Sequence, residues 1–185
     1  MDSLIRQVLS ELQACVSQIS VESLAQASAL IESAPRIFVA GAGRSGLCMR
    51  ALGMRLMHLG KTVYVVGETT TPGIATKDLL IIGSGSGRAA SLLAMTRRAR
   101  SCDARILLFT TNVSSPMAEL ADQLVLVTAP SLGMNEGERD HMSIQPMGTL
   151  FEQSLLILCD SLILSMMRQN GVSAAHMLER HANLE

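Results

Sequence analysis

The chain has 185 residues, enough for one domain with a single buried core but short for a nucleotide-binding domain joined to a separate substrate domain. Its 15 basic and 16 acidic residues give a net charge of −1, and one Tyr, three Phe and no Trp provide neither a basic stripe nor a stacking surface for bases. We therefore expect no nucleic-acid partner.

Residues 1–33 are predicted to form two N-terminal helices. Leu4, Val8, Leu12 and Cys15 recur at helical spacing, and Ser20 is the expected N-cap of the second helix. Charged residues near the start stand where a signal peptide would need an apolar core, so we expect no signal peptide, and the longest apolar stretch, residues 154–167, is interrupted by a charged residue. We expect a cytoplasmic protein with no membrane partner.

Between residues 36 and 127, short apolar runs alternate with longer helical segments. Strands are expected at 36–40, 62–66, 78–82, 104–110 and 123–127, helices at about 45–59 and 87–100, and a short helix behind Ser115-Pro116. The strand runs lack polar alternation, which is typical of parallel strands covered on both faces. The sequence therefore predicts one α/β domain over residues 1–185, with a doubly wound, flavodoxin-like sheet of five parallel strands sandwiched by helices.

The C-terminal part, residues 146–185, is predicted to contain helices and a tail. A polar loop over 128–144 precedes it, is long enough to suggest a functional role, and carries His141 as a candidate lid residue. The helix expected at 146–169 is apolar nearly all round. In a domain of this size such a helix is expected to be buried against another subunit, which predicts a homo-oligomer.

Two glycine loops follow predicted strands. Residues 41–46, GAGRSG, fit the dinucleotide pattern G-x-G-x-x-G, and Glu68 lies about 20 residues further on, where a ribose-binding acid would sit. However, a second loop at 83–87, GSGSG, reaches the same edge of the sheet and adds the hydroxyls of Ser84 and Ser86. This pair favours a cradle for one phosphate. The alternative is that the glycines only permit tight turns and close packing.

Five segments, GAGRSGL, VYVVGETTTPGI, DLLIIGSGSG, SIQPMGTLFEQ and HANLE, together resemble the 6-phospho-3-hexuloisomerases of the sugar isomerase (SIS) domain superfamily. The resemblance covers almost the whole chain. It implies a five-stranded parallel α/β sandwich, a dimer or tetramer, and no NAD. It also implies conversion of D-arabino-3-hexulose 6-phosphate to D-fructose 6-phosphate in the ribulose monophosphate route of formaldehyde fixation.

The second loop departs from the pattern of this superfamily. There the loop usually continues as Ser-Gly-Ser-Gly-Glu-Thr and the threonine donates to phosphate, whereas this chain has Arg88-Ala89. Either Ser91 or Arg88 replaces the lost hydroxyl, or phosphate binding depends on the other groups of the two loops. Those candidate binding residues are Gly43, Arg44, Ser45, Ser84, Gly85 and Ser86.

Moving a carbonyl between C3 and C2 of a sugar requires a base and stabilisation of an enediolate, but no cofactor and no metal. Glu152 is the candidate base, because its apolar neighbours Phe151 and Leu155 favour proton uptake; the resemblance points to the same residue. The alternative is that Glu152 is solvated at an exposed helix start. Glu68 is a candidate acceptor for sugar hydroxyls.

His58 and His181 are the candidate catalytic histidines. His58 lies 13 residues after Ser45 on one predicted helix, about 20 Å from its own glycine loop, so it would serve a neighbouring subunit. Its alternative role is to interact with the dipole at a helix end. His181 lies in a tail that can close over a site.

Three other functions remain open at this stage. One is another phosphosugar isomerase, such as an enzyme acting on arabinose 5-phosphate. A second is a non-catalytic module that senses phosphosugars, and the third, least favoured, is a dinucleotide enzyme. The four cysteines, Cys15, Cys48, Cys102 and Cys159, are widely spaced, which favours reduced thiols over a zinc site or disulfides.

Overall fold

The computed structural model describes residues 1–130 and 143–184. The helices are α1 (Asp2–Val16), α2 (Val21–Ser33), α3 (Gly43–His58), α4 (Ala90–Ser101), the 3-10 turn η1 (Ala118–Leu120), α6 (Thr149–Asn170) and α7 (Ala174–Leu178); the strands are β1 (Ile37–Gly41), β2 (Val63–Val65), β3 (Leu79–Gly83), β4 (Arg105–Thr110) and β5 (Gln123–Leu126). The two N-terminal helices and all five strands are confirmed. The Ser20 hydroxyl accepts from Ser23 N–H, as expected for an N-cap. Most of the polar loop, including His141, lies outside the described residues.

The sheet is entirely parallel, with strand order β2-β1-β3-β4-β5. This is the flavodoxin-like order, in which ligands bind where the connections diverge, between the carboxyl ends of β1 and β3. The two strands end in register, because Gly41 of β1 lies opposite Gly83 of β3. The two glycine loops therefore leave the sheet side by side.

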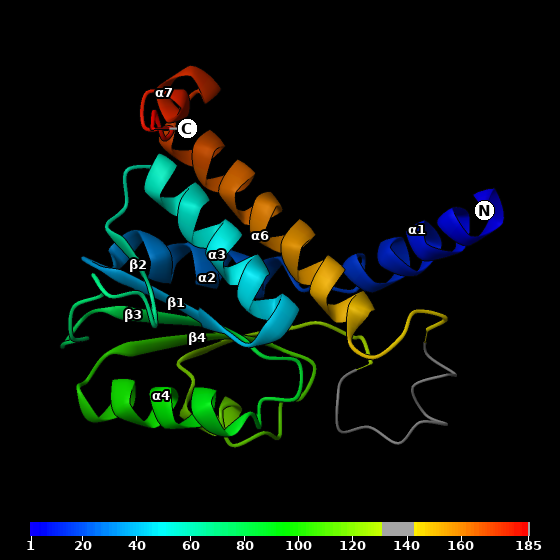
Figure 1. Cartoon of the computed structure of the whole chain (residues 1–185), viewed down its shortest axis with the longest axis horizontal. Coiled ribbons are helices and arrows are strands. Elements are labelled where there is room, and N and C mark those ends of the chain that lie inside the picture. Colours follow the sequence, from blue (N-terminus) through cyan, green and yellow to red (C-terminus); the bar gives the residue numbers. More distant parts are fainter. Residues whose placement is uncertain (131–142, 185) are drawn as a thin grey trace.

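Successive strand residues face opposite sides of the sheet and enter two separate cores. Ile37, Val39, Leu79 and Ile81 pack with α1, α2, α3 and α6, whereas their neighbours in sequence pack with α4 and η1. Figure 1 shows the sheet between the layer containing α3 and α6 and the layer containing α4. The predicted α/β sandwich is confirmed, and its site-bearing edge lies where α3, α4 and α6 begin.

Two helices begin later than the sequence predicted. α4 begins at Ala90 rather than Gly87, because Gly87 adopts a φ of 63°, which is not helical. Only glycine fits at this position, since a Cβ would lie 2.0 Å from Ser115 Oγ. α6 begins at Thr149 rather than Pro146, since Met147 has a φ of 59° and Gly148 is the N-cap. Ala89 thus becomes an N-cap with no side-chain hydrogen bond.

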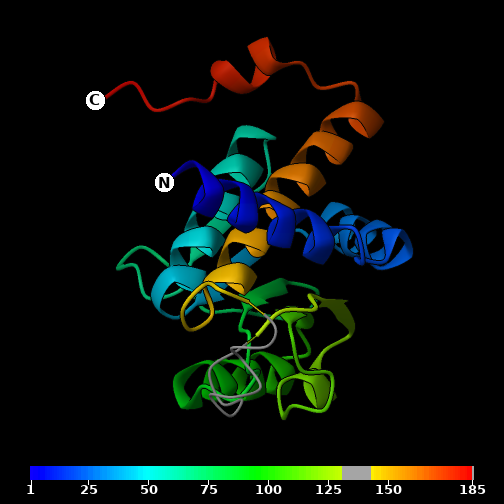
Figure 2. The same cartoon turned by 90° about the vertical axis from the view of Figure 1, so that its right-hand side faces the viewer.

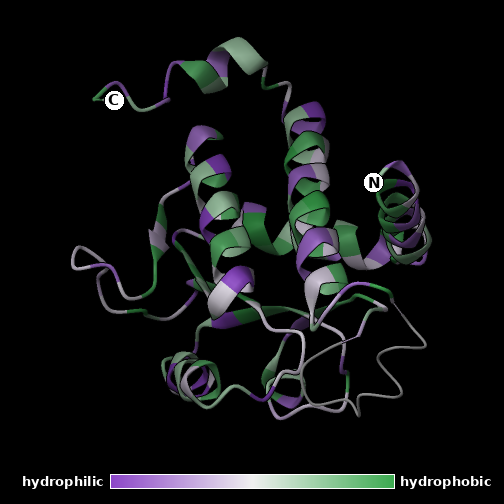
Figure 3. Ribbon diagram, turned by 45° about the vertical axis from the view of Figure 1, so that its right-hand side comes forward, coloured by the Kyte–Doolittle hydropathy of each residue, from purple (hydrophilic) through white to green (hydrophobic). Residues whose placement is uncertain are grey.

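α6 is buried by its own chain on one face only. Its contacts are with α3, α1 and α2, while Leu156, Ile157 and Leu164 remain 39–54% exposed. By length and composition α6 could cross a membrane, but half of its most apolar window is buried inside the protein. Figure 3 shows apolar residues along most of its length.

α1 extends from the body of the protein, and the C-terminal end of α1 crosses α6 (Figures 1 and 2). Its outer half exposes three large apolar side chains, Leu4, Ile5 and Leu9, each more than 50% exposed. Together with the outer face of α6, this helix exposes a group of apolar side chains, whereas single exposed leucines are common on any protein surface.

Candidate active site

The first glycine loop is a close contact between a strand end and a helix start. A Cβ on Gly46 would lie 2.6 Å from Gly41 O, and a Cβ on Gly41 would lie 2.8 Å from Gly46 N. Neither position can accept a side chain without moving backbone. These glycines therefore serve packing, and they hold the end of β1 close to the first turn of α3.

A cavity of about 350 Å³ lies at this junction. It is lined by residues of the two loops and of the starts of α4 and α6: Ala42, Gly43, Arg44, Ser45, Gly83, Ser84, Gly85, Ser86, Ala89, Leu92, Met147, Gly148, Phe151 and Glu152. Seven of the ten predicted site residues are brought together here. The N-termini of α3, α4 and α6 all border the cavity, and each contributes a partial positive charge and free N–H groups.

Two serines in the cavity are suited to bind an anion. Ser45 and Ser84 are 9% and 6% exposed, and no hydrogen bond between described residues engages either hydroxyl. Ser86 Oγ accepts from Arg88 N–H at 3.3 Å and keeps its own proton free to donate. Because neither oxygen is among the fully buried unpartnered atoms of the described residues, both hydroxyls are open to the cavity and free to donate to an anion there.

The end of β4 holds the second loop in place. Gly85 O accepts hydrogen bonds from the hydroxyls of Thr110 and Thr111, at 2.9 and 3.0 Å, and from Thr111 N–H. Sequence analysis missed both threonines; the polar pair at the end of an apolar strand was the available signal. They support the loop from outside the cavity.

Glu152 forms an ion pair with Arg44 across the cavity. Arg44 Nε donates to Glu152 Oε2 at 2.5 Å, joining α3 to α6. The carboxylate lies in the first turn of α6, so the prediction that it sits two turns into a helix was wrong. Phe151 is buried beside it as expected, but the carboxylate also contacts a guanidinium, which the sequence analysis did not foresee.

The two proposed replacements for the missing threonine hydroxyl do not reach the cavity. Arg88 is exposed and donates to Ser114 O at 3.5 Å, and Ser91 is exposed in the first turn of α4; neither lines the cavity. Ala89, at the position of that threonine, does line it. Glu68 also lies outside the lining, where it pairs with Arg50 of α3 with both side chains about half exposed.

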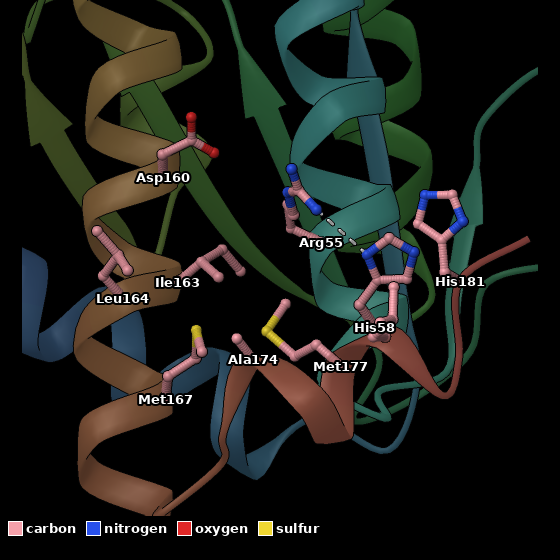
Figure 4. Close-up of a pocket in the computed structure, with 10 residues that line it drawn as sticks. Arg55, His58, Asp160, Ile163, Leu164, Met167, Ala174, Met177 and His181 are labelled. Atoms are coloured by element: carbon pink, nitrogen blue, oxygen red, sulfur yellow. Dashed lines mark hydrogen bonds between the residues drawn. The ribbon is translucent and has the colours of Figure 1, made fainter.

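His58 and His181 meet at a second cavity, of about 440 Å³, at the far end of α3 (Figure 4). Their rings stack with centroids 5.4 Å apart, and Arg55 Nη1 lies 3.5 Å from His58 Nδ1. Burial, together with Arg55 and His181, lowers the pKa of His58, whose residue is 2% exposed. A neutral imidazole is therefore favoured, which weakens the alternative that His58 acts as a cation at the helix end.

Within the described ranges, no group of three or more His, Cys, Asp or Glu side chains is arranged to hold a metal ion. The four cysteines are all unpaired. The first cavity thus offers an anion cradle, one carboxylate and one exposed cation. This set can bind a phosphorylated compound and move a proton on it.

Comparison with known proteins identifies close relatives. The SIS domain profile matches residues 30–157. The 3-hexulose-6-phosphate isomerase of Bacillus subtilis (strain 168) is 40% identical over 181 residues, covering 98% of this chain and 97% of that protein. The enzyme of the same name from Mycobacterium gastri is 41% identical, covering 96% and 88%. A crystal structure from Methanococcus jannaschii, reported to infer a function of 3-hexulose-6-phosphate isomerase, superimposes with a TM-score of 0.85 at 31% identity, covering 99% of each chain.

Proposed function

The chain belongs to the SIS domain family and, within it, to the 3-hexulose-6-phosphate isomerases, and we propose that the cavity between α3, α4 and α6 is its active site. The enzyme interconverts D-arabino-3-hexulose 6-phosphate and D-fructose 6-phosphate in the ribulose monophosphate pathway. The carrying observation is that three helix N-termini, two serines with hydroxyls free to donate and one carboxylate line the same cavity. A phosphosugar matches this set, because its phosphate fits the donors and its carbonyl carbons can face the carboxylate.

The phosphate is held by the cradle of the two loops. Ser45, Ser84 and Ser86 donate hydroxyl protons, and the first-turn N–H groups of α3 and α4 add backbone donors. Ala89 supplies no hydroxyl, so the cradle has one side-chain donor fewer than the usual loop of the family. The residues Gly43 and Gly85 keep the backbone close to the ligand.

Glu152 is the proposed base. It removes the proton from C2 of the 3-hexulose phosphate, giving the 2,3-enediolate, and returns the proton at C3, while a hydroxyl proton passes from O2 to O3. Atoms and electrons balance without an external oxidant, so the step needs no cofactor. Donors near the start of α6 stabilise the charge that develops on the sugar oxygens.

We propose that His58 and His181 act in a site shared between subunits. The two rings lie together but at the opposite end of α3 from Glu152, about 20 Å away along the helix. The exposed apolar side chains of α1 and α6 provide surface for a homo-oligomer, as a dimer or tetramer. Glu68 belongs to the same proposal as a contact for sugar hydroxyls. The unpaired cysteines suit a cytoplasmic enzyme.

The test of the base is Glu152→Gln in an assay that couples fructose 6-phosphate formation to a reporter, run with and without EDTA. We expect kcat to fall by about 100-fold or more, the range of general base catalysis, with little change in phosphosugar affinity. Glu119→Gln, an exposed carboxylate on η1, is the control. Near-normal turnover of Glu152→Gln would remove this residue as the base, and inhibition by EDTA would contradict the metal-free mechanism.

Mixing the subunits tests the shared site. Glu152→Gln and His58→Ala subunits, each folded and inactive alone, should regain activity when co-assembled, because some sites then combine two intact halves. Absence of recovery would contradict the contribution across subunits. A substrate panel that includes arabinose 5-phosphate decides between this enzyme and other phosphosugar isomerases, and binding without turnover of any member would favour a sensing module.

A further inference from the structure

We propose that Arg44 couples phosphate binding to activation of the base: its guanidinium binds the Glu152 carboxylate, and a phosphate group in the cradle competes for the guanidinium and draws it away. This inference rests on the proposed function, because it assigns Glu152 the role of base. It makes the phosphate of the substrate an activator of proton transfer as well as an anchor.

The two partners of the ion pair differ in freedom. The Arg44 side chain is 61% exposed, whereas that of Glu152 is 18% exposed. Glu152 is further fixed through its backbone, since its N–H donates to Gly148 O and its carbonyl accepts from Cys48 Sγ at 3.3 Å. When the pair separates, Arg44 is therefore the partner that moves.

The phosphate cradle lies where Arg44 can reach it. Arg44 precedes Ser45 in the first turn of α3, and both line the same cavity as Ser84. A phosphate monoester carries nearly two negative charges against one on the carboxylate, and its oxygens match the planar guanidinium in a two-point contact. Phosphate is thus the stronger partner for Arg44 once it occupies the cradle.

Release of Glu152 changes what the carboxylate can do. A carboxylate oxygen that accepts a short hydrogen bond from a guanidinium has one lone pair occupied and the guanidinium beside it, so it is not free to approach a C–H bond of the substrate. After Arg44 leaves, Glu152 remains beside buried Phe151 with no other cation bonded to it among the described residues. The freed carboxylate oxygen can then approach C2–H and accept its proton, which the guanidinium otherwise blocks.

The decisive experiment separates the sugar from its phosphate. The substrate is unphosphorylated D-arabino-3-hexulose, measured with and without inorganic phosphate by coupled detection of fructose. In the wild-type protein we expect inorganic phosphate to raise turnover by about tenfold or more, the worth of one charged hydrogen bond. Arg44→Gln should be faster than wild type without phosphate and should gain nothing when phosphate is added.

Arg97→Gln is the matched control, because Arg97 is also an exposed arginine on a helix that borders the cavity but lies outside the cavity lining. It should retain the wild-type response to phosphate. If Arg44 only anchors phosphate, Arg44→Gln will show no gain without phosphate, and the proposal is overturned. Equal activation of Arg44→Gln and wild type overturns it as well.

A second measurement does not depend on turnover. The ¹³C signal of the Glu152 carboxyl carbon, assigned from its loss in Glu152→Gln, should shift when inorganic phosphate is added to the wild-type protein. The signal of Arg44→Gln should already be displaced and should respond less. An unchanged Glu152 signal with phosphate bound would refute the coupling between Arg44 and Glu152. If the signal shifts but the protein does not convert hexulose 6-phosphate, only the proposed activity is contradicted.

Discussion

Ala89→Thr should tighten phosphate binding, because it returns a hydroxyl to the position where the SIS pattern has one. Ala89 lines the active-site cavity and is the N-cap of α4, with φ −56° and ψ 121°. These angles suit a β-branched residue. The threonine oxygen can accept from an N–H of the first turn of α4 while its proton is donated to phosphate, so both interactions form together.

The hydrogen bond to phosphate sets the expected gain in affinity, and the contact at the N-cap sets the expected gain in stability. A hydrogen bond to a charged group contributes about 1.5 to 3 kcal/mol, and 1.4 kcal/mol corresponds to a factor of ten, so fructose 6-phosphate should bind about 10-fold to 100-fold more tightly. The N-cap contact adds about 1 kcal/mol to the free energy of unfolding. The present cap has no side-chain hydrogen bond, so nothing existing is lost.

The assay is isothermal titration calorimetry of fructose 6-phosphate, with thermal unfolding of the unliganded protein measured in parallel. Ser91→Ala is the control, since Ser91 is exposed in the first turn of α4 and outside the cavity; it should leave fructose 6-phosphate affinity within about twofold, as expected of surface changes. A higher unfolding temperature with unchanged affinity would show that the hydroxyl reaches only the helix cap. That result would refute the assignment of Ala89 to the phosphate cradle.

Two further predictions concern pH. Burial, Arg55 and His181 lower the pKa of His58, so the imidazole binds a proton more readily in the unfolded chain than in the folded protein. The free energy of unfolding should therefore fall as pH drops below about 6.5. His58→Gln should flatten this pH dependence, whereas the exposed control His176→Gln should not. Burial alone would raise the pKa of Glu11, but hydrogen bonds from the segment 143–145 lower it below 4.5. The stabilising contribution of ionised Glu11 is therefore present above pH 4.5 and is lost as pH falls through the lowered pKa. The acid unfolding curve of Glu11→Gln should be shallower than that of the exposed control Glu22→Gln. Identical curves would contradict the role of Glu11 as an anchor for the segment 143–145.

Much of the fold could be predicted from local patterns. Apolar runs such as 78–82 mark buried parallel strands, because only backbone that is covered on both faces lacks polar alternation. The two glycine loops were placed at one edge of the sheet because parallel strands must all end on the same side. The register of Gly41 with Gly83 then makes the loops neighbours.

Helix starts were less accessible to sequence analysis. The apolar periodicity of α4 and α6 is clear, but both begin three residues later than expected. The reason is backbone geometry: Gly87 and Met147 take positive φ values, which end the preceding turn before the helix can begin. This shift moves Ala89 into the cavity wall and Glu152 into the first turn of its helix.

The sequence by itself determined the strands and the two glycine loops, because these depend on residue type and on spacing along a few turns or strands; the role of Glu152 as the base stays a prediction. Only the tertiary structure decided which charges meet. Arg44 and Glu152 are 108 residues apart, and His58 stacks on His181 from the far end of the chain. Such contacts follow from how α3 packs against α6 and where the tail returns, and no local periodicity encodes that packing.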